Sequence, residues 1–68
     1  MTIEELGQKI KDRRNTLSIS QRKLADYTGL SVVTLSQIES GKANPSFETL
    51  NEIFHFLSLE ILVVVKKR

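Results

Sequence analysis

The first helix is predicted by a repeating pattern of apolar side chains. Apolar residues recur at spacings of three and four near the start of the chain, at Ile3, Leu6 and Ile10. With polar residues between them, they predict an amphipathic helix over about residues 3–15. Thr2 and Glu5 have the spacing of a capping box, in which each side chain accepts a hydrogen bond from the backbone amide of the other. We therefore expect the helix to begin directly after Thr2.

Three further helices are predicted after the first. Each pattern follows a serine, at Ser20, Ser31 and Ser46. Serine is a favoured N-cap because its hydroxyl accepts a hydrogen bond from a backbone amide that has no partner in the helix. The predicted helices cover residues 21–28, 32–40 and about 47–57.

Glycines and a proline mark where these helices end. Gly29 and Gly41 follow the second and third helices, where glycine adopts a positive φ without steric cost. Pro45 keeps the residue before it out of helical geometry. The last helix carries one apolar stripe, formed by Phe47, Leu50, Ile53, Phe54 and Leu57.

The pattern changes after Ser58. Residues 59–65 are apolar except for Glu60 and rich in β-branched side chains, which predicts a buried strand. Because no second strand pattern exists in the chain, we expect it to pair with the same strand of another copy. The predicted fold is all-α, a compact four-helix domain over residues 1–58, with a C-terminal dimerisation strand and basic tail over residues 59–68. The predicted dimerisation residues are Leu59, Ile61, Leu62, Val63, Val64 and Val65.

Length and charge narrow the function classes. The 68 residues suffice for one small domain, and the chain has no cysteine, which excludes disulfides and thiolate metal sites. Positions 9 to 42 hold seven basic and three acidic residues, whereas positions 43 to 65 hold three acidic and no basic ones. The first part of the chain therefore suits a polyanionic partner.

Other function classes find little support. The longest apolar run, residues 61–65, is far shorter than the ~20 residues that span a bilayer, and we expect a cytoplasmic protein with no membrane partner. His55 is a lone histidine, which argues against a metal site. No nucleophile constellation, phosphate loop or paired carboxylate indicates catalysis. We expect no cofactor, no small-molecule substrate and no enzymatic activity.

The second and third predicted helices form a helix-turn-helix, with Gly29 in the joint and small Ala25 at the crossing. The sequence here resembles the lambda-repressor-like (Xre-type) DNA-binding family. The matching segments are residues 20–25, 29–31, 34–42 and 44–46, within a resemblance that covers about residues 3–58. The resemblance implies a four-helix fold whose third helix enters the major groove of DNA.

Site residues follow from this resemblance, position by position. The residues placed at DNA are Gln21, Arg22, Ser31, Val32, Val33, Thr34, Gln37, Lys42 and Asn44. Gln37 can bond an adenine edge through its amide, while the valines offer only apolar contact to bases. Arg22 supplies sequence-independent charge. Arg14 and Glu39 are expected, again from the family, to form a buried ion pair that orients the helices.

Five of these positions also have a plainer explanation. Val32 and Val33 could belong to the core, and Gln37 and Lys42 could simply be solvated. The hydroxyl of Thr34 could bond its own helix instead of a phosphate.

Within this family, the sequence is most similar to the HipB-type antitoxins, because a single strand is predicted after the helices. This resemblance implies a homodimeric repressor that binds a palindromic operator in double-stranded DNA and also binds a HipA-like kinase toxin. The alternative is a protein-interaction module that binds a partner by strand or surface contacts without specific DNA binding. Steep salt dependence of DNA binding would distinguish the two.

Overall fold

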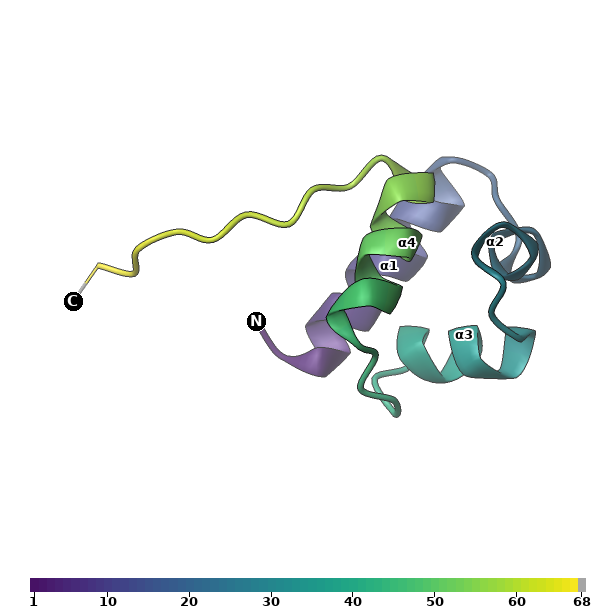
Figure 1. The fold of residues 1–68 in the computed structure, drawn as a ribbon, viewed down its shortest axis with the longest axis horizontal. Coiled ribbons are helices and arrows are strands. Elements are labelled where there is room, and N and C mark those ends of the chain that lie inside the picture. The colour runs from purple at the N-terminus through teal and green to yellow at the C-terminus, as the bar shows by residue number, and fades with distance from the viewer. Residues whose placement is uncertain (68) are drawn as a thin grey trace.

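The computed structural model describes residues 1–67, and its regular elements are four helices (Figure 1). They are α1 (Ile3–Thr16), α2 (Gln21–Thr28), α3 (Val32–Glu39) and α4 (Phe47–Leu57). The four predicted helices are confirmed, with boundaries that differ by no more than a residue or so. Each predicted N-cap serine accepts a hydrogen bond from the backbone amide three residues further on. None of the described helices is long and apolar enough to cross a membrane.

The capping box at the start of α1 is present as predicted. The amide of Glu5 donates to Thr2 Oγ1 over 3.1 Å, and the amide of Thr2 donates to Glu5 Oε1 over 3.2 Å. The backbone hydrogen bond from Thr2 and its side-chain contact lower the pKa of the Glu5 carboxyl, because both favour the charged form. The cap therefore stabilises the folded state most above the ordinary pKa of a glutamate. This stabilisation is lost as pH falls through the lowered pKa of Glu5.

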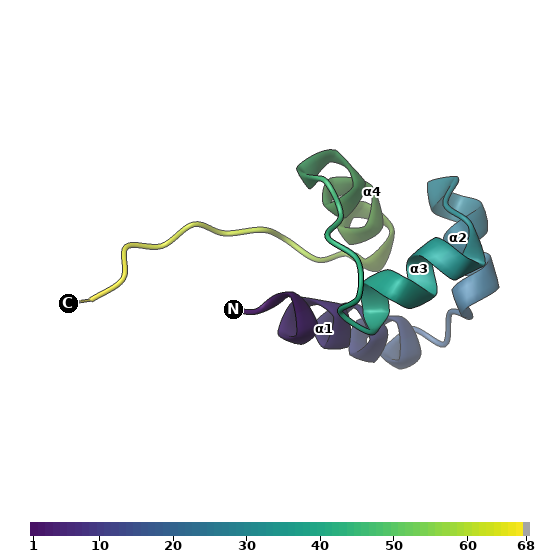
Figure 2. The ribbon, with the colours of Figure 1, turned by 90° about the horizontal axis from the view of Figure 1, so that it is seen from below.

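One apolar core lies between the four helices. Helix α1 packs against α3 and α4, and α2 packs against the same two helices (Figure 2). The core side chains are Ile10, Leu24, Ala25, Leu35, Ile38, Ile53 and Leu57. Because α2 and α3 have only eight residues each, neither would be stable alone, and their position depends on this shared core.

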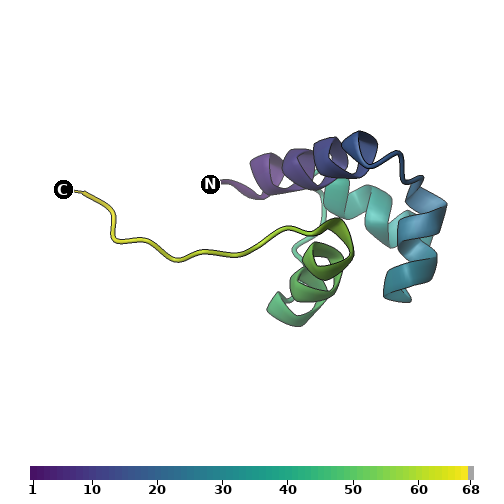
Figure 3. The ribbon, with the colours of Figure 1, turned by 90° about the horizontal axis from the view of Figure 1, so that it is seen from above.

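The predicted C-terminal strand is wrong. No strand is assigned within residues 1–67, and residues 60–67, called here the arm, run away from the helices as an irregular extended segment (Figures 1 and 3). Leu59 is tied to the helical body, since its amide donates to Phe54 O over 2.9 Å. β-Branched side chains favour an extended backbone, but a strand also needs a neighbouring backbone to bond. Residues 1–67 contain no second such segment.

Ser58, which ends α4, lies in the left-handed region at φ 55° and ψ 42°. Replacing Ser58 with glycine is expected to raise the free energy of unfolding by about 0.5–1 kcal/mol, because glycine carries no steric penalty there. Urea denaturation measures the change, with Ser36→Gly inside α3 as the control that should lose about 0.5 kcal/mol. A loss of stability in Ser58→Gly would mean that its hydroxyl contributes more than the backbone strain costs.

Candidate nucleic-acid interface

The outer face of α3 carries two exposed side chains of the predicted DNA site. Val33 is 67% exposed, and Gln37, one turn later, is also exposed, so neither belongs to the core. Val32 is different: it is partly buried and packs against the core cluster. The surface that α3 offers to a ligand is therefore centred on Val33 and Gln37, and Val32 mainly anchors the start of the helix.

Ser31 and Thr34 form a small polar unit at the beginning of α3. The amide of Thr34 donates to Ser31 Oγ over 3.0 Å, and the Ser31 hydroxyl donates to Thr34 Oγ1 over 2.9 Å. Ser31 is thus committed to capping the helix. The Thr34 hydroxyl accepts in this pair, which leaves its own hydrogen available to an acceptor such as a phosphate oxygen.

A buried polar network fixes the direction of α3. Arg14 in α1 is 8% exposed and Glu39 at the end of α3 is 5% exposed. Arg14 Nε donates to Glu39 Oε2 over 2.8 Å, and its terminal nitrogen donates to Oε1 over 3.0 Å. The expected buried ion pair is confirmed. Its bidentate geometry defines an orientation between α1 and α3 that a single contact would leave loose.

Gln21 joins this network from α2. Its Nε2 donates to Glu39 Oε1 over 3.1 Å, so the amide links the start of α2 to the end of α3. The predicted contact of Gln21 with phosphate stays a prediction, and the carboxamide oxygen and second amide hydrogen remain for it. In the structure, Gln21 has a positioning role that its sequence position did not indicate.

Gly7 is a second positioning residue that the sequence interpretation missed. It is buried in α1, where a Cβ would overlap Ile38 O and lie 2.7 Å from Glu39 O. The absence of a side chain lets α1 approach the backbone at the end of α3. A lone glycine inside a helical pattern is the signal that could have found this contact.

Basic and polar side chains surround the outer face of α3. Arg22, Lys42 and Asn44 are exposed, and their contact with DNA stays a prediction. The amide of Lys42 donates to Gln37 O over 2.9 Å. A shallow polar pocket lies next to them, lined by Gln8, Lys11, Gln21, Ser36, Glu39 and Ser40. Gln8, Lys11 and Ser36 were not among the predicted site residues, although Lys11 belongs to the basic part of the sequence.

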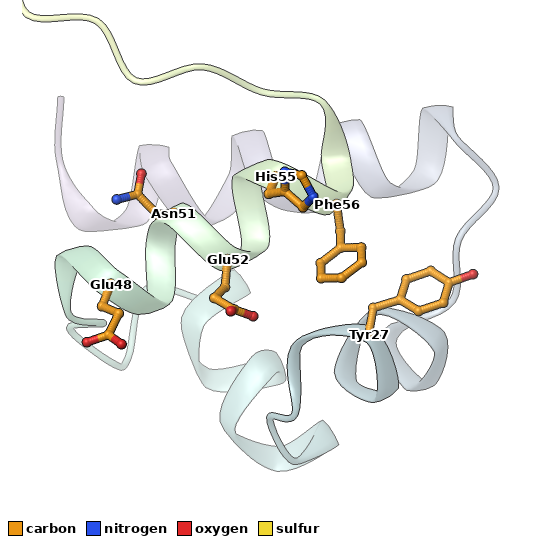
Figure 4. A pocket seen from close by; sticks show the side chains of 6 residues that line it. All are labelled: Tyr27, Glu48, Asn51, Glu52, His55 and Phe56. Carbon is orange, nitrogen blue, oxygen red and sulfur yellow. The ribbon is translucent and has the colours of Figure 1, made fainter.

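The groove between α2 and α4 has a different character (Figure 4). The Tyr27 and Phe56 rings stack at 5.2 Å between centroids, and Glu48 and Glu52 lie along the same groove. Acidic side chains repel a polyanion, so this side of the molecule does not suit nucleic acid. Within the described residues, no group of three potential ligands there or elsewhere could hold a metal ion.

The predicted dimerisation residues divide into two groups. Leu59 packs against the core cluster of its own chain, and Ile61 is partly exposed. The side chains that are mostly exposed are Leu62, Val63, Val64 and Val65. The structure therefore leaves Val63, Val64 and Val65 largely exposed, while Ile61 and Leu62 line a groove shared with α1 and α4.

Solved structures with a similar fold are described as a controller protein and a gene regulator. The restriction-modification controller protein C.AhdI from Aeromonas hydrophila is 26% identical, with a TM-score of 0.81 over 85% of this chain and 88% of that one. The clp gene regulator ClgR from Corynebacterium glutamicum is 28% identical, with a TM-score of 0.85 over 90% of this chain and 78% of that one.

Sequence relatives agree with the fold. The ImmF control region 10 kDa protein of Bacillus phage phi105 is 36% identical over 90% of this chain and 68% of that protein. The HTH-type transcriptional regulator y4dL of Sinorhizobium fredii is 34% identical over 94% of this chain, which spans only 33% of that protein. The Helix-turn-helix family model matches residues 10–63. The chain belongs to the helix-turn-helix family.

Proposed function

We propose that the chain is a sequence-specific regulator of transcription that places α3 in the major groove of double-stranded DNA. The observation that carries this proposal is the exposed pair Val33 and Gln37 on a helix whose other face is locked into the core. An exposed amide and a methyl-bearing side chain one turn apart suit an adenine edge and a thymine methyl.

Phosphate contacts would come from the surrounding side chains. Lys42 and Asn44 follow α3, Arg22 lies in the first turn of α2, and Lys11 lines the polar pocket beside α3. These groups cannot distinguish sequences, but they fix the position of the helix on the duplex and supply most of the non-specific affinity. Ser31 and Val32 complete the proposed site as the cap and anchor that hold the exposed side chains in place.

We further propose that two copies bind a palindromic operator. One eight-residue helix covers only a few base pairs, so a second copy about one helical turn away would multiply the specificity. The exposed apolar arm favours self-association, because monomers seldom leave such a run of side chains in water. A dimer bound over a promoter would act as a repressor by occupying the site of the polymerase.

The test compares two single variants on a panel of DNA duplexes. A selected high-affinity site and versions of it with one base pair changed are titrated by fluorescence anisotropy. Gln37→Ala is expected to weaken binding to the selected site by about 1–3 kcal/mol and to relax the preference at one base pair. Lys42→Ala is expected to weaken binding to all duplexes alike and to reduce the slope of log affinity against log salt by about 1.

The outcome that contradicts the proposal is equally specific. If Gln37→Ala weakens binding to all duplexes equally, the amide of Gln37 contacts only the DNA backbone, and this side chain does not distinguish bases. If the parent protein binds no duplex at low salt, the alternative interaction module is favoured. The HipB-type antitoxin role and its kinase toxin partner remain predictions, and the strand that suggested them is absent from the described residues.

A further inference from the structure

An apolar groove is lined by residues of α1, α4 and the start of the arm. The arm leaves the helices at the end of α4 (Figure 1). The volume of the groove is about 420 Å³. Outside the C-terminal segment, its lining consists of Met1, Leu6, Lys9, Phe47, Leu50 and Phe54. Phe47 is 67% exposed although it belongs to the apolar stripe of α4. This end of the stripe therefore has no covering in the single chain.

The arm has a matching exposed apolar surface. Val63 is 97% exposed and Val65 98%, with Leu62 and Val64 only slightly more covered. At roughly 100 Å² per apolar side chain, these four with Met1 and Phe47 expose about 600 Å² in each copy. Two copies that bury this surface reach the lower limit of about 1,200 Å² for a specific interface.

From these surfaces we propose that the arm of one copy lies in the α1–α4 groove of a second copy. This inference rests on the homodimer of the proposed function and names the surface that forms it. In this dimer the arm contacts helices of the second copy, whereas the sequence analysis predicted that two strands pair. The arrangement therefore requires no hydrogen bonds between strands.

Length and charge fit this arrangement. Residues 62–67 extend over about 20 Å, and α4, with its 11 residues, is about 16 Å long, so the arm can follow the whole groove. The arm carries Lys66 and Lys67 near its end, whereas Glu4 and Glu5 lie in the first turn of α1 next to Met1. An arm that points its basic end toward this turn places opposite charges together.

The arm of the same chain is a poorer occupant of the groove. Only its first residues, up to Leu62, line the groove, and the rest departs from it. To fill its own groove the chain would have to reverse direction near Leu62. Glycine and proline favour such reversals, and neither occurs after Pro45. The β-branched run Val63–Val65 instead favours an extended path.

Engineered cysteines test the contact directly, because the chain has none of its own. Protein carrying Phe47→Cys is mixed with protein carrying Val64→Cys under mild oxidation, and covalent dimers are measured by mass spectrometry. We expect mixed disulfide dimers in high yield and little product from either variant alone. Phe56→Cys, an exposed aromatic position in the α2–α4 groove, is the matched control and should give little product with Val64→Cys.

Three results would overturn the proposal. A high yield of Val64→Cys homodimers would place arm against arm. A double variant with both cysteines in one chain that forms a disulfide within the monomer would place the arm in its own groove. A parent protein that sediments as a dimer but gives no mixed disulfide would place the interface elsewhere, while a parent that sediments as a monomer would remove the homodimer as well.

A second measurement avoids cross-linking. Phe47→Glu is expected to weaken self-association at least tenfold in sedimentation equilibrium, because it puts a charge into the buried contact. Phe56→Glu, the control, is expected to stay within about twofold of the parent. Equal effects of the two substitutions would overturn the proposal. Anisotropy with a single half-site duplex, which needs no dimer, shows separately whether α3 still binds DNA.

Discussion

Replacing Glu39 with alanine is expected to lower the free energy of unfolding by about 3–5 kcal/mol, measured by urea denaturation. The change leaves two donor groups of Arg14 without their acceptor in a site where this residue is 8% exposed. It also removes the acceptor of Gln21. A domain of this size has a total stability of about 3–10 kcal/mol, so the variant should lose a large fraction of its free energy of unfolding.

Two controls separate the network from a general effect of losing a carboxylate. Glu52→Ala removes an exposed carboxylate from α4 and should change stability by no more than about 0.5 kcal/mol. The double variant Arg14→Leu with Glu39→Leu removes both charges and should recover much of the loss, since no unpaired charge stays buried. A loss below about 1 kcal/mol in Glu39→Ala would show that water reaches Arg14 freely.

Replacing Gly7 with alanine is expected to cost about 1–3 kcal/mol, although alanine is the better helix former. The new methyl group would meet carbonyl oxygens of Ile38 and Glu39, and backbone cannot move aside as a flexible side chain can. We expect α3 to shift, so DNA affinity should fall further than the loss of stability explains. Urea denaturation and fluorescence anisotropy measure the two effects.

The neighbouring position provides the control for Gly7. Gln8 lies in the same helix and is exposed. Gln8→Ala should therefore leave the free energy of unfolding within about 0.5 kcal/mol of the parent. If Gly7→Ala were as stable as the parent and bound DNA equally well, α1 and α3 would not be in the close contact described above.

Much of the local structure could be predicted from the sequence, for identifiable reasons. Ser20, Ser31 and Ser46 act through hydrogen bonds to amides three residues away, so their effect depends on local spacing alone. Gly29 has the positive φ, 75°, that its place after α2 predicted. These features need no information about the rest of the chain.

The C-terminal segment shows where such prediction ends. Its composition predicted a buried strand, and both parts of that prediction are wrong: no strand is assigned at residues 59–67, and Leu62 to Val65 are exposed. Whether an extended segment becomes a strand depends on a second backbone, which composition does not specify. The packing of Leu59 against the core of its own chain was missed for a related reason, and for Val32 the core was only one of two alternatives. Burial depends on which helices meet and at what angle.

The sequence by itself determined the four helices, their caps, the helix-turn-helix and the basic character of its surroundings, because each depends on residues close together in the chain. Only the tertiary structure decided that Gly7 lets α1 approach α3, that Gln21 joins the Arg14–Glu39 pair, and that Phe47 and the arm stay exposed. These features arise from contacts between residues far apart in the sequence, and packing in three dimensions selects such contacts.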